Sequence, residues 1–508
     1  MKANLMFRDK EFNIEDNLLY GKSTLTSDLE LQCILSNMAL KDEIVSASCS
    51  SALFCPLQSI EEIQYRQENL RDALENSGTV RQLYAITIET ERRRRSSWHW
   101  LSPSGHLVSN LSSAVDLLKI YTEMLMELRL VADKALSAFQ SKGFQSLLTM
   151  FQRELSDDYF AEIRSHLNDL REDGMVVSAT LGNYLQGIGY VLRRKTKKGF
   201  WRRWHFAPSY TIAPRDTGGA VDLAKRQDRA INEATNALAQ AAEHLEGFFA
   251  MLRRELAFYI GCLNLSDSLR ELGLPICIPD LLPSDSKDRS WHGLYDVSLV
   301  MTKHSSAIGN ELTADNKQLY IITGANQGGK STFLRSLGQA QLMAQSGMFV
   351  GAESFSVPIR RGVFSHFKRE EDTTMKSGKL DEELTRMSEL VNHLEGGTLM
   401  LFNESFAATN EREGSEISRQ ITQALIENGV EVFSVTHLYT YAVSFLADET
   451  TQYLRAQRLE SGKRTFKIVP GEPLQTAFGE DLYQEIFVKP DDSSNGTSGP
   501  HGEPLDDR

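Results

Sequence analysis

Residues 318–337 read QLYIITGANQGGKSTFLRSL, and this stretch decides the fold. The apolar run at 318–323 predicts a strand, and the segment at 331–347 predicts a helix. Between them, Gly324 and Gly329 have the GxxxxGK[ST] spacing of a phosphate-binding loop. Glycines there let successive backbone N–H groups turn toward phosphate oxygens, and the start of the helix adds partial positive charge. The stretch therefore predicts a nucleotide site at a strand-to-helix turn.

The residues of this loop have distinct expected roles. Lys330 should reach the β- and γ-phosphates of ATP, and the Ser331 hydroxyl should ligate Mg²⁺. A second GKST, at residues 21–24, has Asp16 in place of the first glycine and follows no apolar strand. It is interpreted as a loop and a helix start, with Ser or Thr as the cap. The expected nucleotide-binding residues are Gly324, Ala325, Asn326, Gln327, Gly328, Gly329, Lys330, Ser331 and Thr332.

The hydrophobic pattern of the sequence differs between the part of the chain that contains this loop and the part that precedes it. From about residue 294, short apolar strands alternate with helices, which favours a mostly parallel sheet with helices on its faces. Residues 27–283 instead have apolar residues at helical spacing, and their longest helical run, about 221–262, is long enough to act as a lever. The Gly- and β-branched-rich part near 174–213 predicts a few strands. The expected fold class is therefore α plus α/β.

Composition narrows the class of protein. The 508 residues suffice for two to four domains, and the formal net charge of -13 means that any nucleic-acid contact must come from local basic patches. The five cysteines form no CxxC pair, which indicates reduced thiols. The N-terminal sequence is too polar for a secretory signal, and no apolar run is long enough to span a membrane. We therefore expect a cytoplasmic protein with no membrane partner.

The strand predicted at 398–403 ends in Asn403-Glu404, where ATPases often have Asp-Glu. An amide keeps one oxygen acceptor and loses a charge, so Asn403 should hold Mg²⁺ indirectly and more weakly. Glu404 should orient or polarise the attacking water. Two interpretations stay open: a slow ATPase, or a nucleotide-binding switch or scaffold with little turnover that acts on a protein partner.

Several motifs resemble those of the MutS family of DNA mismatch-repair ATPases. The phosphate loop is similar to the family's TGPNMxGKST, with Ala325 in place of Pro. The segment NESFAATNEREG, residues 403–414, aligns without gaps on the family's DE-x-x-x-GT-x-x-x-x-G. Thr436-His437 is like the family's ATH motif. Weaker matches are PLQSIEEIQYRQENLRDAL at 56–74 and PLQTAFGEDL at 473–482.

The resemblance implies helical levers joined to a P-loop ATPase of the ABC type, with ATP and Mg²⁺ as cofactors. It implies a homodimer that ATP binding closes, with helical levers that carry the change to a distal site for DNA or another partner. The implied catalytic residues are Glu404, Lys330 and His437, and a structural histidine is the alternative at His437. A transporter-type P-loop ATPase is a rival that the missing LSGGQ-like stretch disfavours. The expected domains are an N-terminal segment (1–26), a helical core or lever region (27–283), the ATPase domain (294–488) and a disordered tail (489–508).

The sequence also departs from the family. The helical core begins by about residue 27, which leaves no room for the family's mismatch-reading domain, so we expect a short MutS-like protein that does not read mismatches. In the segment DTTMKSGKLDEEL at 372–384, Gly378 falls where the family has a Ser that reaches the partner's nucleotide, with Ser377 beside it. Glu383 matches the family's downstream acid. Whether Ser377 takes the place of the family's Ser is left open.

Two basic stretches stand out against the acidic whole. Arg92–Arg95 form one, and 193–205, with aromatic residues between the charges, forms the other. Such stretches can neutralise phosphates and stack on bases, or pair with the chain's own acids. The expected DNA-binding residues are Arg193, Arg194, Lys195, Lys197, Lys198, Arg202 and Arg203.

Overall fold

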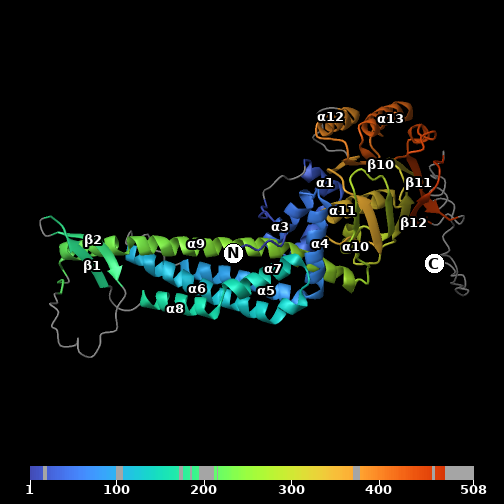
Figure 1. Cartoon of the computed structure of the whole chain (residues 1–508). Coiled ribbons are helices and arrows are strands. Elements are labelled where there is room, and N and C mark those ends of the chain that lie inside the picture. The colour runs from blue at the N-terminus through green and yellow to red at the C-terminus, as the bar shows by residue number, and fades with distance from the viewer. Residues whose placement is uncertain are drawn as a thin grey trace, which may run out of the picture. The chain divides into compact units, whose positions relative to one another are not determined.

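The chain divides into two compact units, which are not contiguous in sequence (Figure 1). The first comprises 1–283, 297–306 and 339–351, and the second comprises 284–296, 307–338 and 352–508. The domain boundaries expected from the sequence stay predictions. The computed structural model describes residues 1–14, 20–98, 107–170, 176–183, 186–193, 211–213, 215–369, 378–459 and 464–474.

The first unit is mainly helical. Its long helix α9 (Thr217–Glu271) has 55 residues, roughly 80 Å at 1.5 Å per residue, and packs against α2, α3, α5 and α6. The stretch from Leu252 to Ser266 is apolar on most sides and largely buried, whereas the polar stretch before Phe248 is mostly exposed. The remaining elements are α1 (Lys22–Asp28), α2 (Leu31–Ala39), α3 (Glu43–Phe54), α4 (Ile60–Glu75), α5 (Ser77–Trp98), α6 (Leu107–Ala135), η1 (Leu136–Ala138), α7 (Lys142–Glu154), α8 (Asp157–Asp169), β3 (Asp280–Leu282) and α10 (Val297–Lys303).

Two local expectations can be compared directly with this unit. The strands predicted near 174–213 are confirmed as an antiparallel hairpin of β1 (Val176–Leu181) and β2 (Gly187–Arg193), and β2 lies against α9. The helix predicted at the first GKST is also present, as α1. Its predicted Ser or Thr cap is wrong, because the cap is Gly21, whose φ of 77° favours a residue without a Cβ.

The N-terminal segment is anchored on the first unit through a buried acid of α9. The main-chain N–H groups of Leu5 and Met6 donate to the Glu255 carboxylate, and the Tyr259 hydroxyl donates to the Leu5 carbonyl at 2.6 Å. Burial raises the pKa of Glu255 to about 7, although the two N–H groups oppose the shift. The folded state therefore binds a proton that the unfolded chain releases at lower pH.

This raised pKa predicts a pH dependence of stability. The contribution of Glu255 is fully present below its ordinary pKa of 4.5 and is lost as the pH rises through about 7. In Glu255→Gln, the difference in unfolding free energy between pH 5 and pH 8 should therefore shrink by about 2–3 kcal/mol. Denaturant unfolding at both pH values measures this, with Glu271→Gln, an exposed acid on the same helix, as the control. An equal pH dependence in wild type and Glu255→Gln would contradict the prediction.

The second unit is built on a six-stranded sheet in the order β12-β11-β6-β10-β9-β8, in which β12 alone runs antiparallel to its neighbour. The four strands predicted at 318–323, 362–367, 398–403 and 431–437 are confirmed. The six strands of the sheet are β6 (Leu319–Thr323), β8 (Val363–Phe367), β9 (Leu399–Asn403), β10 (Glu431–Val435), β11 (Thr451–Arg458) and β12 (Arg464–Pro470), of which the first four are the predicted ones.

Other elements complete this unit. The strands β4 (Arg289–Leu294), β5 (Asn310–Ala314) and β7 (Ser354–Pro358) pair antiparallel. Helices α12 (Lys379–Val391), α13 (Glu411–Glu427) and α14 (Tyr439–Val443) follow strands of the large sheet, and α11 (Lys330–Gln345), which belongs to this unit up to Gly338, begins at the phosphate loop. Apolar residues of β6, β9, β10 and α14 form a buried core between sheet and helices. The α plus α/β fold class is thus confirmed.

Candidate nucleotide site

The carboxyl ends of three neighbouring parallel strands meet at one edge of the large sheet. Strand β10 lies between β6 and β9, and Val435 is level with both Ile322 and Asn403. Beyond the strands, the Thr436 N–H donates to the Ile322 carbonyl at 3.1 Å, and the Glu404 N–H donates to the Val435 carbonyl at 2.8 Å. This pairing brings the phosphate loop, the Asn403-Glu404 pair and the Thr436-His437 pair to the same edge.

The phosphate loop requires its glycines. Gly324 has a φ of 114° and Gly329 a φ of 92°, both in the region that side chains with a Cβ disfavour. A Cβ on Gly328 would lie 2.7 Å from the Cβ of Ala456 and 2.9 Å from the Ala325 carbonyl oxygen. The loop therefore passes close to its own backbone and to β11, in a shape that substituted residues would disturb.

Lys330, the first residue of α11, is directed into the loop. Its side chain is buried, and its Nζ donates to the Gly324 carbonyl at 2.8 Å and to the Ala325 carbonyl at 3.1 Å. Burial lowers the pKa of Lys330, and the negative charge of Glu404 opposes that shift. The ammonium group is thus positioned at the loop with carbonyl partners, from which it can turn toward an anion.

Ser331 and Asn403 lie in direct contact. The Ser331 hydroxyl donates to the Asn403 Oδ1 at 2.8 Å, which joins the start of α11 to the end of β9. The amide oxygen here accepts as an aspartate oxygen would, without the charge. These two oxygens would hold Mg²⁺ directly or through water.

The loop after β9 carries the candidate acid in an uncommon conformation. Glu404 is half-buried and has a φ of 54°, in the left-handed region. The motif glycine that follows, Gly414, lies against this loop, because a Cβ there would come within 2.5 Å of the Phe406 carbonyl oxygen. Thr409 donates to Glu413 in the first turn of α13. The residues shared with the family motif therefore fix the path of the chain that presents Glu404.

Other predicted residues are placed as follows. His437 is exposed just after β10, and Thr332 is half-buried in α11. Asn326 and Gln327 are exposed at the tip of the loop. Arg464 of β12 donates to the Gln327 Oε1 at 2.8 Å, a contact that the sequence analysis missed because nothing around Arg464 resembles a motif.

The two basic stretches differ in their surroundings. In the first, Arg92 and Arg93 donate to Glu89, and Arg94 and Arg95 donate to Glu91. These pairs correspond to the alternative that the stretch pairs with the chain's own acids. In the second, Arg193 is exposed and its Nε donates to the Ser178 hydroxyl at 2.9 Å. Outside the described residues lie Arg194, Lys195, Lys197, Lys198, Arg202, Arg203, Ser377 and residues 475–482.

The residues present at the sheet edge fit a nucleoside triphosphate with Mg²⁺. Backbone N–H groups at a helix start, a buried lysine and a hydroxyl–amide pair are complementary to phosphates and to a hard cation. The parallel sheet and this edge together define a P-loop nucleotide-binding fold.

Comparison with known proteins identifies the family. The MutS2 N-terminal domain matches residues 58–272, and MutS domain V matches residues 320–468. The chain therefore belongs to the MutS family, as the sequence motifs predict. In the described part of the chain, no helix has the length and apolar character needed to cross a membrane.

Curated relatives support the same assignment. Endonuclease MutS2 of Thermus thermophilus is 31% identical over 169 residues, which are 33% of this chain and 23% of that protein. Endonuclease MutS2 of Leuconostoc mesenteroides is 27% identical over 221 residues, 40% of this chain and 26% of that protein. DNA mismatch repair protein MutS of Lactobacillus delbrueckii is 29% identical over 196 residues, 37% of this chain and 22% of that protein. The chain thus spans about a quarter of the length of these relatives.

Proposed function

We propose that this chain binds ATP with Mg²⁺ at the sheet edge and hydrolyses it slowly. The observation that carries the proposal is the meeting of Lys330, the Ser331–Asn403 pair and Glu404 at the carboxyl ends of β6, β10 and β9. Lys330 and the loop N–H groups bind the phosphates, and Ser331 and Asn403 hold the metal. Glu404 orients the attacking water, and His437 senses the γ-phosphate.

The amide at position 403 slows the reaction by weakening the hold on Mg²⁺. Asn403 accepts the Ser331 hydrogen, so the geometry of the pair is kept, but no negative charge faces the cation there. Such a site needs more free Mg²⁺ for the same occupancy. This explanation keeps the ATPase proposal consistent with the departure from Asp-Glu.

Asn403→Asp tests this explanation. The added charge should lower the Mg²⁺ concentration for half-maximal turnover by about tenfold, which corresponds to about 1.4 kcal/mol. The measurement is phosphate release at fixed ATP over a range of Mg²⁺ concentrations. Asn410→Asp, at the start of α13, is the control, because it adds the same charge beyond the metal-holding pair. A half-maximal Mg²⁺ concentration that is equal in wild type and Asn403→Asp would contradict this role.

We propose further that ATP binding closes a homodimer on DNA and that hydrolysis resets it. Membership of the MutS family and the name of one relative, a DNA mismatch repair protein, support a DNA-linked role. The basic residues of 193–205 run in sequence from the end of β2, at Arg193, toward α9, which begins at Thr217. We assign the DNA contact to the basic residues of 193–205, because Arg92–Arg95 are paired with acids of this chain.

Charge neutralisation tests the DNA contact. Glutamine at Arg193, Arg194, Lys195, Lys197, Lys198, Arg202 and Arg203 should weaken duplex binding. It should also reduce the slope of log affinity against log salt by about 0.9 for each phosphate that the protein no longer neutralises. Glutamine at Arg92, Arg93 and Arg95 is the matched control and should leave the slope unchanged, because these residues bind the chain's own glutamates. If the control variant changes the slope of log affinity against log salt and the test variant does not, the DNA contact does not lie in 193–205.

The second candidate function, a nucleotide-binding switch acting on a protein partner, is favoured by the amide at Asn403. It predicts tight ATP binding without turnover and no salt-sensitive retention on a DNA column. Sedimentation with and without ATP, at matched protein concentrations, shows whether the dimer forms in either case.

A further inference from the structure

The loop that carries Glu404 is held in a conformation that its residues do not favour. Both Glu404 and Phe406 have positive φ, at 54° and 59°, and neither is glycine. For residues with a Cβ, this left-handed region is sparsely populated, and such residues persist only where surrounding contacts fix them. The contacts around Ser405, the residue between the two, therefore decide where Glu404 points.

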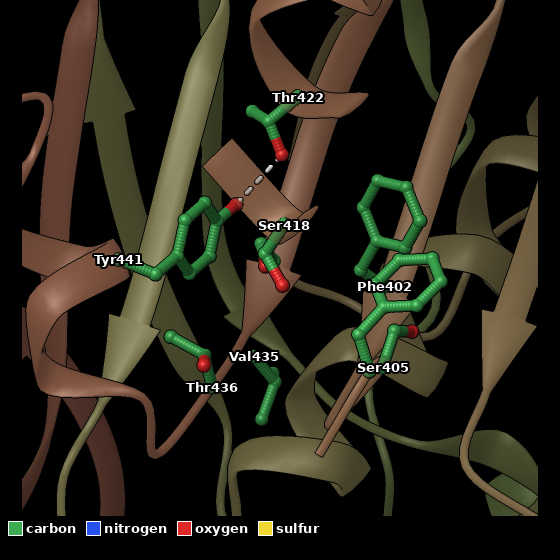
Figure 2. Close-up of a pocket in the computed structure, with 9 residues that line it drawn as sticks. Phe402, Ser405, Ser418, Thr422, Val435, Thr436 and Tyr441 are labelled. Atoms are coloured by element: carbon green, nitrogen blue, oxygen red, sulfur yellow. Dashed lines mark hydrogen bonds between the residues drawn. The ribbon is translucent and has the colours of Figure 1, made fainter. Parts of the chain in front are cut away.

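One side of Ser405 borders empty space. A cavity of about 10 Å³ lies there, with the hydroxyl residues Ser418 and Thr436 among its lining residues. Figure 2 shows Ser405 at one end of this cavity and Tyr441, whose hydroxyl lies 2.9 Å from that of Thr422, at the other. The room there is that of about one water molecule. Packing on this side is therefore incomplete next to Ser405.

On its other side, the loop is held by a buried histidine of β8. The Nδ1 of His366 lies 2.9 Å from the Ser405 hydroxyl oxygen, which is 2.5 Å from the His366 main-chain oxygen. The imidazole ring stacks on the Phe406 ring, with centroids 5.2 Å apart and planes 17° apart. His366 therefore contacts both residues that follow Glu404.

The second ring nitrogen ties the same histidine to α12. The Nε2 of His366 lies 3.1 Å from the main-chain oxygen of Glu383. Because a carbonyl only accepts, Nε2 carries the hydrogen toward Glu383, and Nδ1 of the neutral ring lies beside the Ser405 hydroxyl, whose one hydrogen is donated to the His366 main-chain oxygen. Burial, with Arg386 as a second cause, lowers the pKa of His366 to about 4, so the ring is neutral near pH 7. The two nitrogens thus join the Glu404 loop to α12.

We propose that His366 is a positioning residue that keeps Glu404 oriented for hydrolysis and couples that orientation to α12. The inference rests on the proposed ATPase activity and adds to it a residue outside every motif of the sequence. The mechanism needs no proton transfer through the ring. It needs the Nδ1 contact with Ser405, which fixes the backbone after Glu404, while the ring of His366 packs against Phe406 beside it.

Three substitutions separate these contacts. His366→Asn places a polar atom where Nδ1 lies, His366→Gln places one near the position of Nε2, and His366→Phe keeps a ring without either nitrogen. We expect kcat within about threefold of wild type for His366→Asn and a loss of about 10- to 100-fold for the other two variants, since small misplacements of catalytic groups have effects of that order. KM and ATP affinity should stay unchanged in all three.

Hydrogen exchange supplies a readout that does not depend on activity. The main-chain N–H groups of residues 404–408 should exchange faster in His366→Gln and His366→Phe and at the wild-type rate in His366→Asn. If the wild type hydrolyses ATP but kcat and main-chain hydrogen exchange are unchanged in His366→Gln and His366→Phe, the role of His366 is overturned and the proposed ATPase activity stands. Absence of phosphate release by the wild type would overturn the proposed function and this inference with it.

Discussion

Replacing Glu404 by glutamine is expected to lower the rate of ATP hydrolysis by about 10²- to 10⁴-fold, the usual range for loss of a group that assists proton transfer. Glu404 follows β9 directly, and its main chain is tied to β10 by the bond to the Val435 carbonyl. With an amide at Asn403, the carboxylate at this point of the edge is that of Glu404. Glutamine keeps its size and hydrogen bonding and removes the charge that polarises water.

Single-turnover phosphate release and equilibrium ATP binding distinguish the possible outcomes. ATP affinity should stay within a few-fold of wild type, because Lys330 and the loop backbone supply phosphate binding. Glu411→Gln, an exposed acid at the start of α13, is the matched control and should behave as wild type. A parallel loss of ATP binding would assign Glu404 to nucleotide binding, and unchanged turnover would remove it from the mechanism.

Glu431→Gln is expected to destabilise the second unit by about 3–5 kcal/mol, the usual result of removing one partner from a buried ion group. The Glu431 carboxylate accepts from Arg289 and, at 2.7 Å, from the Nε of Arg360. All three residues are buried. Burial alone would raise the pKa of Glu431, but the two guanidinium groups outweigh it and hold the pKa below its usual value. Without the carboxylate charge, two buried cations face each other.

Denaturant unfolding measures this loss. Glu395→Gln is the matched control, because its 2.7 Å ion pair with Arg361 is more than 60% exposed on both sides and should contribute less than about 1 kcal/mol. The lowered pKa also means that the stabilisation from Glu431 is present above the ordinary pKa of 4.5 and is lost as the pH falls. An equal loss of unfolding free energy in Glu431→Gln and Glu395→Gln would contradict the buried ion group of Glu431, Arg289 and Arg360.

Much of the second unit follows from local sequence. Apolar runs and glycine spacing predict β6, β9, β10 and the phosphate loop, because each depends on residues close together in the chain. The prediction that Asn403 replaces an aspartate near Ser331 is consistent with the 2.8 Å contact between the two side chains. Local patterns therefore sufficed for these three strands and for the path of the loop between β6 and α11.

What local patterns miss are contacts set by strand order and burial. His366 meets Ser405 because β8 lies beside β9, and Arg464 meets Gln327 through the edge of the sheet, so neither contact has a signature in its own segment. The helix α9 extends beyond the predicted 221–262 at both ends: the Asp216 side chain caps its start by accepting from the Gly219 N–H, and the helix continues past Cys262 to Glu271. The first GKST has a glycine cap because the left-handed backbone at Gly21 outweighs the preference of Ser or Thr for the cap position.

Steady-state phosphate release from ATP by the purified chain, with and without Mg²⁺, tests the central claim most directly. Lys330→Ala gives the background, because it removes the buried ammonium from the loop. The account predicts slow release that saturates with ATP, requires Mg²⁺ and is absent in Lys330→Ala. Release by the wild type that does not exceed the Lys330→Ala background at any Mg²⁺ concentration would contradict it and leave the nucleotide-binding switch as the function of this chain.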